Sequence, residues 1–312
     1  YDTYGFPVDL TRDLAQENEL SMDLSGYEKL MATQRANAKK ESKFEALLPA
    51  AIDLEDETKF VGYEDSSIES EIKLIFKDGK EVKSASEGEC MIVLDSTPFY
   101  GESGGQVGDK GKLSAKGLEI EVLDTQKIGN FHLHISKIKK GSINLNDRVK
   151  AEINTERRRA IVSNHSATHL MHSALRNILG EHVQQKGSLV NEEKLRFDFS
   201  HKQKLSESEI VKIEQEVNQA IVSAEDTQII ETSIEESQKL GAIAFFGEKY
   251  GDQVRVLKIA GDYSTELCGG THVKNSSEIK SFKIISETSI SSGVRRIEAI
   301  SGDLAIKDKA DN

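Results

Sequence analysis

The sequence has no tryptophan, three prolines and two cysteines among its 312 residues. Two cysteines cannot build the disulfide framework of a small secreted domain, and they suit a reducing compartment, so we expect a cytoplasmic protein. No apolar run approaches the roughly 18 residues that a membrane-spanning helix needs, and no signal peptide is visible. The chain opens on Tyr1 instead of methionine, which favours a fragment of a longer protein.

Positive charge is also scarce, because 41 Lys and Arg face 53 Asp and Glu and leave a net charge of −12. This balance argues against broad, non-specific binding to nucleic acids such as DNA, which depends on neutralising phosphates. It leaves room for a local basic patch, for which Arg157–Arg159 and Arg295–Arg296 are the candidates. The alternative for both clusters is a solvated helix face or a set of salt bridges to the many acids.

Hydrophobic patterning predicts the α+β class and three domains. Residues 1–50 form polar helices with too little apolar surface to fold alone. Residues 51–152 carry short strand-like runs with turns expected at Asp78–Gly79 and Lys140–Gly141, which predicts a small antiparallel β-barrel. Residues 153–312 alternate long helices with strands, which predicts an α+β domain with a largely antiparallel sheet.

Two long helices are expected in the third domain, one beginning at an N-cap on Thr155 and ending at Gly180, the other running from Ser206 to about Ala224. A short helix is expected at Glu235–Leu240. Strands are expected near residues 72–76, 90–94, 118–122, 131–135, 188–190, 195–199, 229–233, 254–259, 279–285 and 294–300. Cys90 lies in an apolar run and is expected in a buried strand. His132 and His134 share one strand face, and a surface position is favoured for them over a metal role.

Two short motifs about a hundred residues apart carry the chemistry. His165 and His169 lie four residues apart in the first long helix, so their imidazoles share one face. Cys268 and His272 belong to a Cys-Gly-Gly-Thr-His turn that follows a strand-like run. Three imidazoles and one thiolate suit a tetrahedral zinc ion. His172 lies roughly 10 Å along the axis from His165, so we leave it out of the ligand set.

Other metal chemistries fit this set less well. A zinc peptidase helix needs a Glu directly after the first His, and Ser166 stands there. The His-x-Glu and Pro-Cys-x-x-Cys pattern of nucleic-acid-base deaminases is absent. A structural zinc finger usually has ligand pairs closer in sequence. Four protein ligands would close the site, so the metal would position substrate unless one ligand is labile.

Two amide side chains are candidates for substrate contact. Gln106 lies in the glycine-rich stretch Tyr100–Asp109, where backbone N–H groups can approach a ligand, although glycine in a barrel turn is the commoner explanation. Gln185 follows the metal helix and enters a strand. Beside a metal pocket it would hydrogen-bond a carbonyl or hydroxyl group, although an exposed glutamine is usually inert.

Together these residues resemble the editing half of alanyl-tRNA synthetases. The motifs that carry the resemblance are His165–His169, Cys268–His272, Gly105–Gln106 with Gly108–Asp109, Leu195–His201, Phe246–Gly251, Gly293–Glu298 and the opening Tyr1–Pro7. The resemblance covers essentially the whole chain and all four metal positions match. Freestanding editing proteins share the barrel and the metal domain but would not need the opening helices, which favours a synthetase fragment whose residues 1–50 end the tRNA-recognition region.

The resemblance implies an ester hydrolase that removes serine or glycine from mischarged tRNA(Ala), with the tRNA acceptor end as partner. It implies Zn²⁺ on His165, His169, Cys268 and His272, and it places Gln185 in the amino-acid pocket. The aminoacylation core, which binds ATP and alanine, is expected upstream, and an oligomerising region downstream. No general base is identified. The alternative is a non-catalytic, zinc-stabilised tRNA-binding module.

Overall fold

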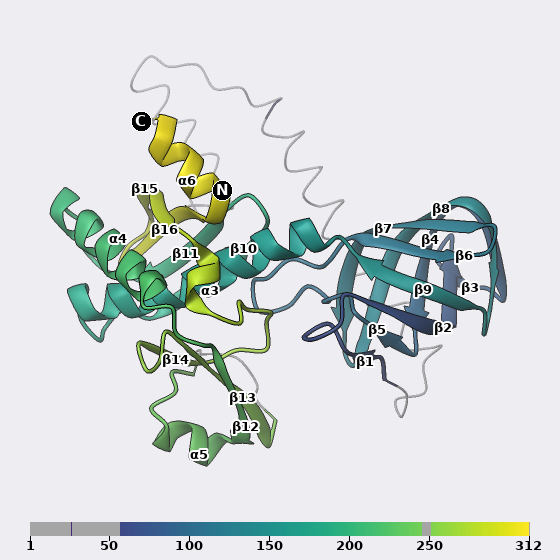
Figure 1. Ribbon diagram of the computed structural model, residues 1–312, viewed down its shortest axis with the longest axis horizontal. Coiled ribbons are helices and arrows are strands. Elements are labelled where there is room, and N and C mark those ends of the chain that lie inside the picture. Colours follow the sequence, from purple (N-terminus) through teal and green to yellow (C-terminus); the bar gives the residue numbers. More distant parts are fainter. Residues whose placement is uncertain (1–25, 27–56, 245–250, 312) are drawn as a thin grey trace.

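The computed structural model describes Gly26, residues 57–244 and residues 251–311. The helices expected over residues 1–50, the motif Tyr1–Pro7 and most of Phe246–Gly251 therefore lie outside the described residues. The α+β class is confirmed, since the described residues form helices and largely antiparallel sheets (Figure 1). Within the described part of the chain, no helix has the length and hydropathy of a membrane span.

The first part is a closed antiparallel β-barrel, shown at the right of Figure 1. Its strands pair in the order β2 (Ser67–Lys77), β4 (Ser84–Leu94), β8 (Phe131–Asn144), β7 (Leu118–Ile128), β6 (Gly111–Ala115) and β9 (Arg148–Ile153), and β9 pairs back onto β2. The short strand β3 (Lys80–Glu81) pairs with β2, and β1 (Lys59–Phe60) and β5 (Ser96–Thr97) form a separate two-stranded parallel sheet. Closure pairs the strand edges, so the barrel presents little unpaired backbone.

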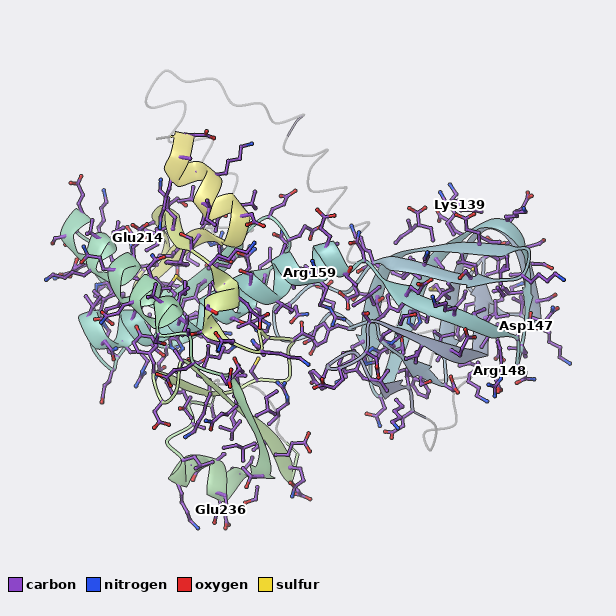
Figure 2. The ribbon with its side chains drawn as sticks, viewed as in Figure 1. Lys139, Asp147, Arg148, Arg159, Glu214 and Glu236 are labelled. Carbon is purple, nitrogen blue, oxygen red and sulfur yellow. The ribbon has the colours of Figure 1, made fainter. Side chains whose placement is uncertain are left out.

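Alternation along the strands fills the barrel with apolar side chains. In β7, Leu118, Ile120 and Val122 are buried while the residues between them are exposed, as period two predicts. Cys90 is also buried, as expected. Charged side chains such as Lys139, Asp147 and Arg148 project from the outer surface (Figure 2).

One of the two expected barrel turns is confirmed. Asp78 and Gly79 join β2 to β3 with φ angles of 50° and 74°, the left-handed pair that a tight hairpin requires. The prediction of a turn at Lys140–Gly141 is wrong, because both residues lie inside the 14-residue strand β8. Gly141 has a φ of 88° close to where the register of β8 against β4 shifts, so its glycine serves a bulge instead of a turn.

The surface position expected for His132 and His134 is also wrong. His134 is fully buried, its Nδ1 lies 2.9 Å from the Ile92 carbonyl and its Nε2 2.8 Å from the Thr97 hydroxyl. His132 is 6% exposed, with Nδ1 2.8 Å from the Phe99 carbonyl. Alternation placed both histidines on one face, but only the barrel closure makes that face the interior.

This burial predicts a pH-dependent stability. Burial lowers the pKa of His134 to about 4 from its ordinary 6.5. Between pH 4 and pH 6.5, His134 is therefore protonated in the unfolded chain but neutral in the folded chain. The contribution of neutral His134 to the free energy of unfolding is present above pH 6.5 and is lost as the pH falls toward 4. The free energy of unfolding should fall by about 2 kcal/mol between pH 7 and pH 5. Urea unfolding at pH 7 and at pH 5 would measure this: the free energy of unfolding should fall with pH in wild type and fall less in His134→Gln. Lys116→Gln, at an exposed lysine of the barrel, is the control and should leave this pH dependence unchanged.

The second part packs two long helices on a four-stranded antiparallel sheet. The helices are α3 (Thr155–Leu179) and α4 (Glu207–Val222), and the sheet runs β10 (Gln185–Val190), β11 (Leu195–Ser200), β16 (Val294–Ser301), β15 (Phe282–Ser291). A smaller antiparallel sheet holds β12 (Gln228–Ser233), β13 (Gln253–Ile259) and β14 (Ser264–Leu267) beside α5 (Ile234–Lys239), and the described chain ends in α6 (Gly302–Asp311) (Figure 1). The main apolar core includes Leu170, Phe197, Val217 and Ile297.

Most expected boundaries in this part are confirmed within a few residues. Helix α4 begins after a Ser206 capping box, and Gly180 ends α3 with a φ of 113°. The cap of α3 is Asn154 and not Thr155, since the Asn154 side chain accepts from the Arg157 N–H at 3.0 Å. The strand expected at 279–285 starts later, at Phe282, because Ser276–Ile279 form a 3₁₀ turn.

Helix α3 leaves the barrel directly and is tied to it by Arg158. The Arg158 guanidinium, 9% exposed as a residue, donates to the Asp109 carboxylate and to the carbonyls of Gly62 (2.7 Å) and Pro98 (3.0 Å), all in the barrel. Three of the other four basic candidates are also paired: Arg157 with Glu192, Arg295 with Glu287 and Arg296 with Asp198. The salt-bridge alternative is therefore confirmed for these four arginines.

Candidate metal centre

The tertiary structure brings the two histidine motifs together. Helix α3 presents His165 and His169 with ring centroids 5.2 Å apart, and the turn after β14 places the His272 ring 4.4 Å from His165 and 5.0 Å from His169. One ligand atom from each of His165, His169, Cys268 and His272 lies within 4.8 Å of the others. It is the one such group among the residues that the structure describes, and His172 is not in it.

The donor atoms fit a single metal ion. The Cys268 Sγ lies 3.6 Å from Nε2 of His165 and 3.2 Å from Nε2 of His272. Nε2 of His169 is buried and has no hydrogen-bond partner among the described residues, a costly state that a metal bond would relieve. Zinc bonds of about 2.0–2.3 Å require donors this close, and three nitrogens with one sulfur suit that ion.

Electrostatics favours the ligand form of the turn residues. Burial would raise the pKa of Cys268, but the neighbouring imidazoles of His165, His272 and His169 outweigh it and hold that pKa well below its ordinary value. The Gly270 N–H also donates to Sγ at 3.4 Å. Burial lowers the pKa of His272 to about 3, which keeps its imidazole neutral. A thiolate and a neutral imidazole are the forms that bind a metal.

Glu266, which the sequence interpretation missed, orients two histidines of α3. Its buried carboxylate accepts from Nδ1 of His169 at 2.5 Å and from Nδ1 of His172 at 2.7 Å. Burial would raise its pKa, but His172 and His169 lower it to about 2. A carboxylate behind a ligand histidine fixes the tautomer and leaves Nε2 for the metal. The available signal was an acidic residue two positions before the cysteine, inside an otherwise buried strand.

Replacing Glu266 with glutamine should weaken zinc binding by about 10- to 100-fold, because one amide oxygen cannot accept from both histidines. Competition between the protein and a chromophoric chelator would measure this. Glu231→Gln, at an exposed position of β12, is the control and should bind zinc like wild type. Equal affinity of Glu266→Gln and wild type would contradict the orienting role.

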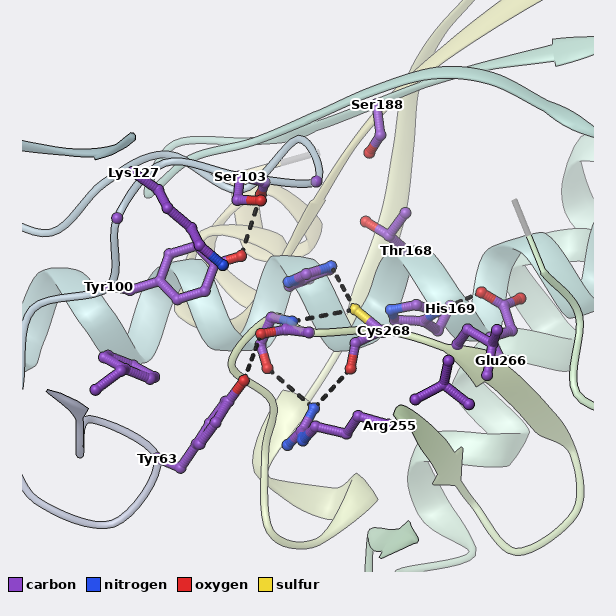
Figure 3. A pocket seen from close by; sticks show the side chains of 18 of the residues that line it. Tyr63, Tyr100, Ser103, Lys127, Thr168, His169, Ser188, Arg255, Glu266 and Cys268 are labelled. Atoms are coloured by element: carbon purple, nitrogen blue, oxygen red, sulfur yellow. Dashed lines mark hydrogen bonds and ion pairs between the residues drawn. The ribbon is translucent and has the colours of Figure 1, made fainter. Parts of the chain in front are cut away.

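A cavity of 680 Å³ opens onto the ligand set (Figure 3). His165, His169 and Cys268 line it, while His272 does not. Gln185 also lines it, together with the hydroxyl-bearing Thr168 and Ser188. Three aromatic residues of the barrel, Phe60, Tyr63 and Tyr100, line it as well. The volume is within the ~300–1,000 Å³ of small-ligand sites.

Gln106 is placed differently from Gln185. Its side chain is fully buried, and its amide is hydrogen-bonded to His165 and Thr271. It does not line the cavity. The two amides that the sequence singled out therefore lie on different sides of the metal ligands, one beside the open space and one behind the histidine.

Two family models match parts of the chain. The family described as tRNA synthetases class II (A) matches residues 1–157, and the one described as threonyl and alanyl tRNA synthetase second additional domain matches residues 254–298. The chain therefore belongs to the class II tRNA synthetase family.

Its curated relatives are alanine–tRNA ligases. The chain is 49% identical to that of Idiomarina loihiensis over 308 residues, 51% identical to that of Hydrogenovibrio crunogenus over 306, and 49% identical to that of Alkaliphilus metalliredigens over 318. In each case 98% of this chain is matched. The chain spans about a third of their length, 35% for the first two.

Proposed function

We propose that this chain is the zinc-dependent editing part of an alanine–tRNA ligase, working in the cytoplasm, and that it hydrolyses the ester of Ser-tRNA(Ala) and Gly-tRNA(Ala). The observation that carries the proposal is the cavity, whose wall includes three of the four ligand residues. An alanine pocket cannot strongly reject an amino acid that adds one hydroxyl or lacks one methyl, so a second site must remove the errors.

The cavity suits an aminoacylated nucleotide end. Aromatic rings on the barrel wall offer a stacking surface for a base. Gln185, Thr168 and Ser188 offer polar atoms to the carbonyl, amine or hydroxyl of the aminoacyl group. Held by His165, His169, Cys268 and His272, zinc would supply polarisation of a carbonyl. The ester is already activated, so orientation by these side chains supplies a large part of the catalysis.

Domain organisation follows from the same proposal. We place the boundary between the barrel and the metal domain at residue 153, where β9 gives way to α3. The tRNA(Ala) acceptor end would enter between the two parts. Activation of alanine with ATP, and oligomerisation, would belong to regions of the ligase outside residues 51–312.

A deacylation assay tests the function directly. Incubation of the chain with Ser-tRNA(Ala) and Gly-tRNA(Ala) should release the amino acid, with Ala-tRNA(Ala) released at least about tenfold more slowly, in line with the specificity that a sorting site must add. Chelation should suppress release and added Zn²⁺ should restore it. Tight binding of the tRNA with its ester left intact would instead favour a non-catalytic, zinc-stabilised tRNA-binding module.

A further inference from the structure

The turn that carries Cys268 and His272 is held by side chains of the barrel as well as by its own domain. Gly269 and Gly270, in the middle of this turn, have no side chains of their own that could anchor it. Its backbone is nevertheless bonded at four consecutive residues, from Cys268 to Thr271. Two of the bonding partners, Tyr63 and Gln106, come from the barrel.

Gln106 bridges the turn and the metal helix. Its Oε1 accepts from the Thr271 N–H at 2.9 Å and lies 2.8 Å from Nδ1 of His165, while its Nε2 donates to the Thr271 hydroxyl at 2.9 Å. An amide oxygen can only accept, so Nδ1 of His165 must carry the proton. The lone pair of His165 is then on Nε2, the atom that lies 3.6 Å from Cys268 Sγ.

The turn packs closely against the Gln106 and His165 side chains. A Cβ on Gly270 would lie 2.2 Å from Cε1 of His165 and 3.0 Å from Oε1 of Gln106. The turn therefore packs directly against both side chains.

Tyr63 bonds the backbone of the same turn (Figure 3). Its hydroxyl donates to the Gly269 carbonyl at 2.7 Å. Arg255 of β13 lies over the Tyr63 ring at 4.4 Å and donates to the carbonyls of Cys268 (2.8 Å) and Gly270 (3.2 Å). Three successive carbonyls are thus fixed by a tyrosine of the barrel and an arginine of the metal domain.

We propose that Gln106 and Tyr63 are positioning residues through which the barrel orders the metal centre. Gln106 sets the tautomer of His165 and the place of Thr271, and Tyr63 holds Gly269. The proposal rests on the metal centre assigned above, and it gives the glycine-rich stretch of the barrel a role behind the ligands instead of on the substrate. Partners behind a ligand histidine typically change metal affinity by about 10- to 100-fold.

The test is the zinc affinity of the full chain, measured against a chromophoric chelator and independent of any activity. Gln106→Leu should bind zinc about 10- to 100-fold more weakly. Gln106→Glu should stay close to wild type, because a carboxylate accepts from His165, from the Thr271 N–H and from the Thr271 hydroxyl. Tyr63→Phe keeps the ring under Arg255 but removes the hydroxyl, and it should bind zinc several-fold more weakly. Gln126→Leu, which removes a barrel glutamine bonded to Glu102 and Asp124, is the control.

Cobalt substitution adds a spectroscopic readout, because the visible absorption of bound Co²⁺ should change in Gln106→Leu and return in Gln106→Glu. If Gln106→Leu does not fold, Gln106→Asn replaces it: its shorter amide stays polar but cannot reach both partners, and it should weaken binding as well. Wild-type affinity in these loss variants, or an equal loss in Gln106→Glu, would overturn the positioning role alone. A wild-type chain that binds no zinc would overturn the metal centre and this role with it.

Discussion

Replacing Cys268 with alanine is expected to abolish zinc binding at ordinary concentrations and to lower deacylation of Ser-tRNA(Ala) by more than about 100-fold. The reason is that loss of a partner behind a ligand already costs about 10- to 100-fold in affinity or activity, and Cys268 is the one sulfur donor of the set. The three remaining imidazoles would face one another without the thiolate that lies 3.2 Å from His272 and 3.6 Å from His165.

Zinc content after dialysis and the rate of serine release measure the two effects. Cys90→Ala is the matched control, since Cys90 is the other cysteine and is buried in the barrel. It should keep both zinc and activity. If Cys268→Ala loses zinc but still releases serine at the wild-type rate, the metal is structural and the zinc-dependent hydrolase is wrong.

Arg158→Met is expected to lower the free energy of unfolding by about 3–5 kcal/mol, because it leaves a buried charge without its partner. The Asp109 side chain is 2% exposed in its pair with Arg158, and the carbonyls of Gly62 and Pro98 would lose a donor as well. All three acceptors lie in the barrel and Arg158 lies in α3, so the loss should also loosen the barrel from the metal domain.

Denaturant unfolding, together with proteolysis near residue 154, would measure this effect. The double variant Arg158→Met/Asp109→Asn should recover part of the loss, because the introduced amide is neutral and its oxygen can still accept from the Tyr100 N–H, which bonds the Asp109 side chain at 2.7 Å. Lys139→Met is the control: Lys139 lies on the barrel surface (Figure 2), its pair with Glu121 is about half exposed, and its loss should leave the free energy of unfolding nearly unchanged. A similarly small effect of Arg158→Met would contradict a stabilising role of the buried Arg158–Asp109 pair.

Local patterns were sufficient for most helices and strands and for the four residues that the structure brings together as a candidate metal centre. Period two along Leu118–Val122, the Ser206 cap and the left-handed turn at Asp78–Gly79 are consequences of neighbouring residues alone. The spacing of His165 and His169 likewise follows from helix geometry. Patterns failed where a residue's partner is distant in sequence: Gly141 was assigned to a turn although β8 continues through it, and His134 was assigned to the surface although the barrel closes over it.

The sequence by itself determined the α+β class, the approximate helix and strand positions, and the residue types of the metal centre, because these depend on local periodicity and on side-chain chemistry. Only the tertiary structure decided which groups stand behind the ligands. Glu266 and Gln106 lie 97 and 59 residues from the histidines they bond, and Tyr63 lies 206 residues from the Gly269 carbonyl. The contact of Glu266 arises when β14 packs against α3 within the metal domain. The contacts of Gln106 and Tyr63 arise when the barrel packs against that domain, and no local pattern encodes these distant pairings.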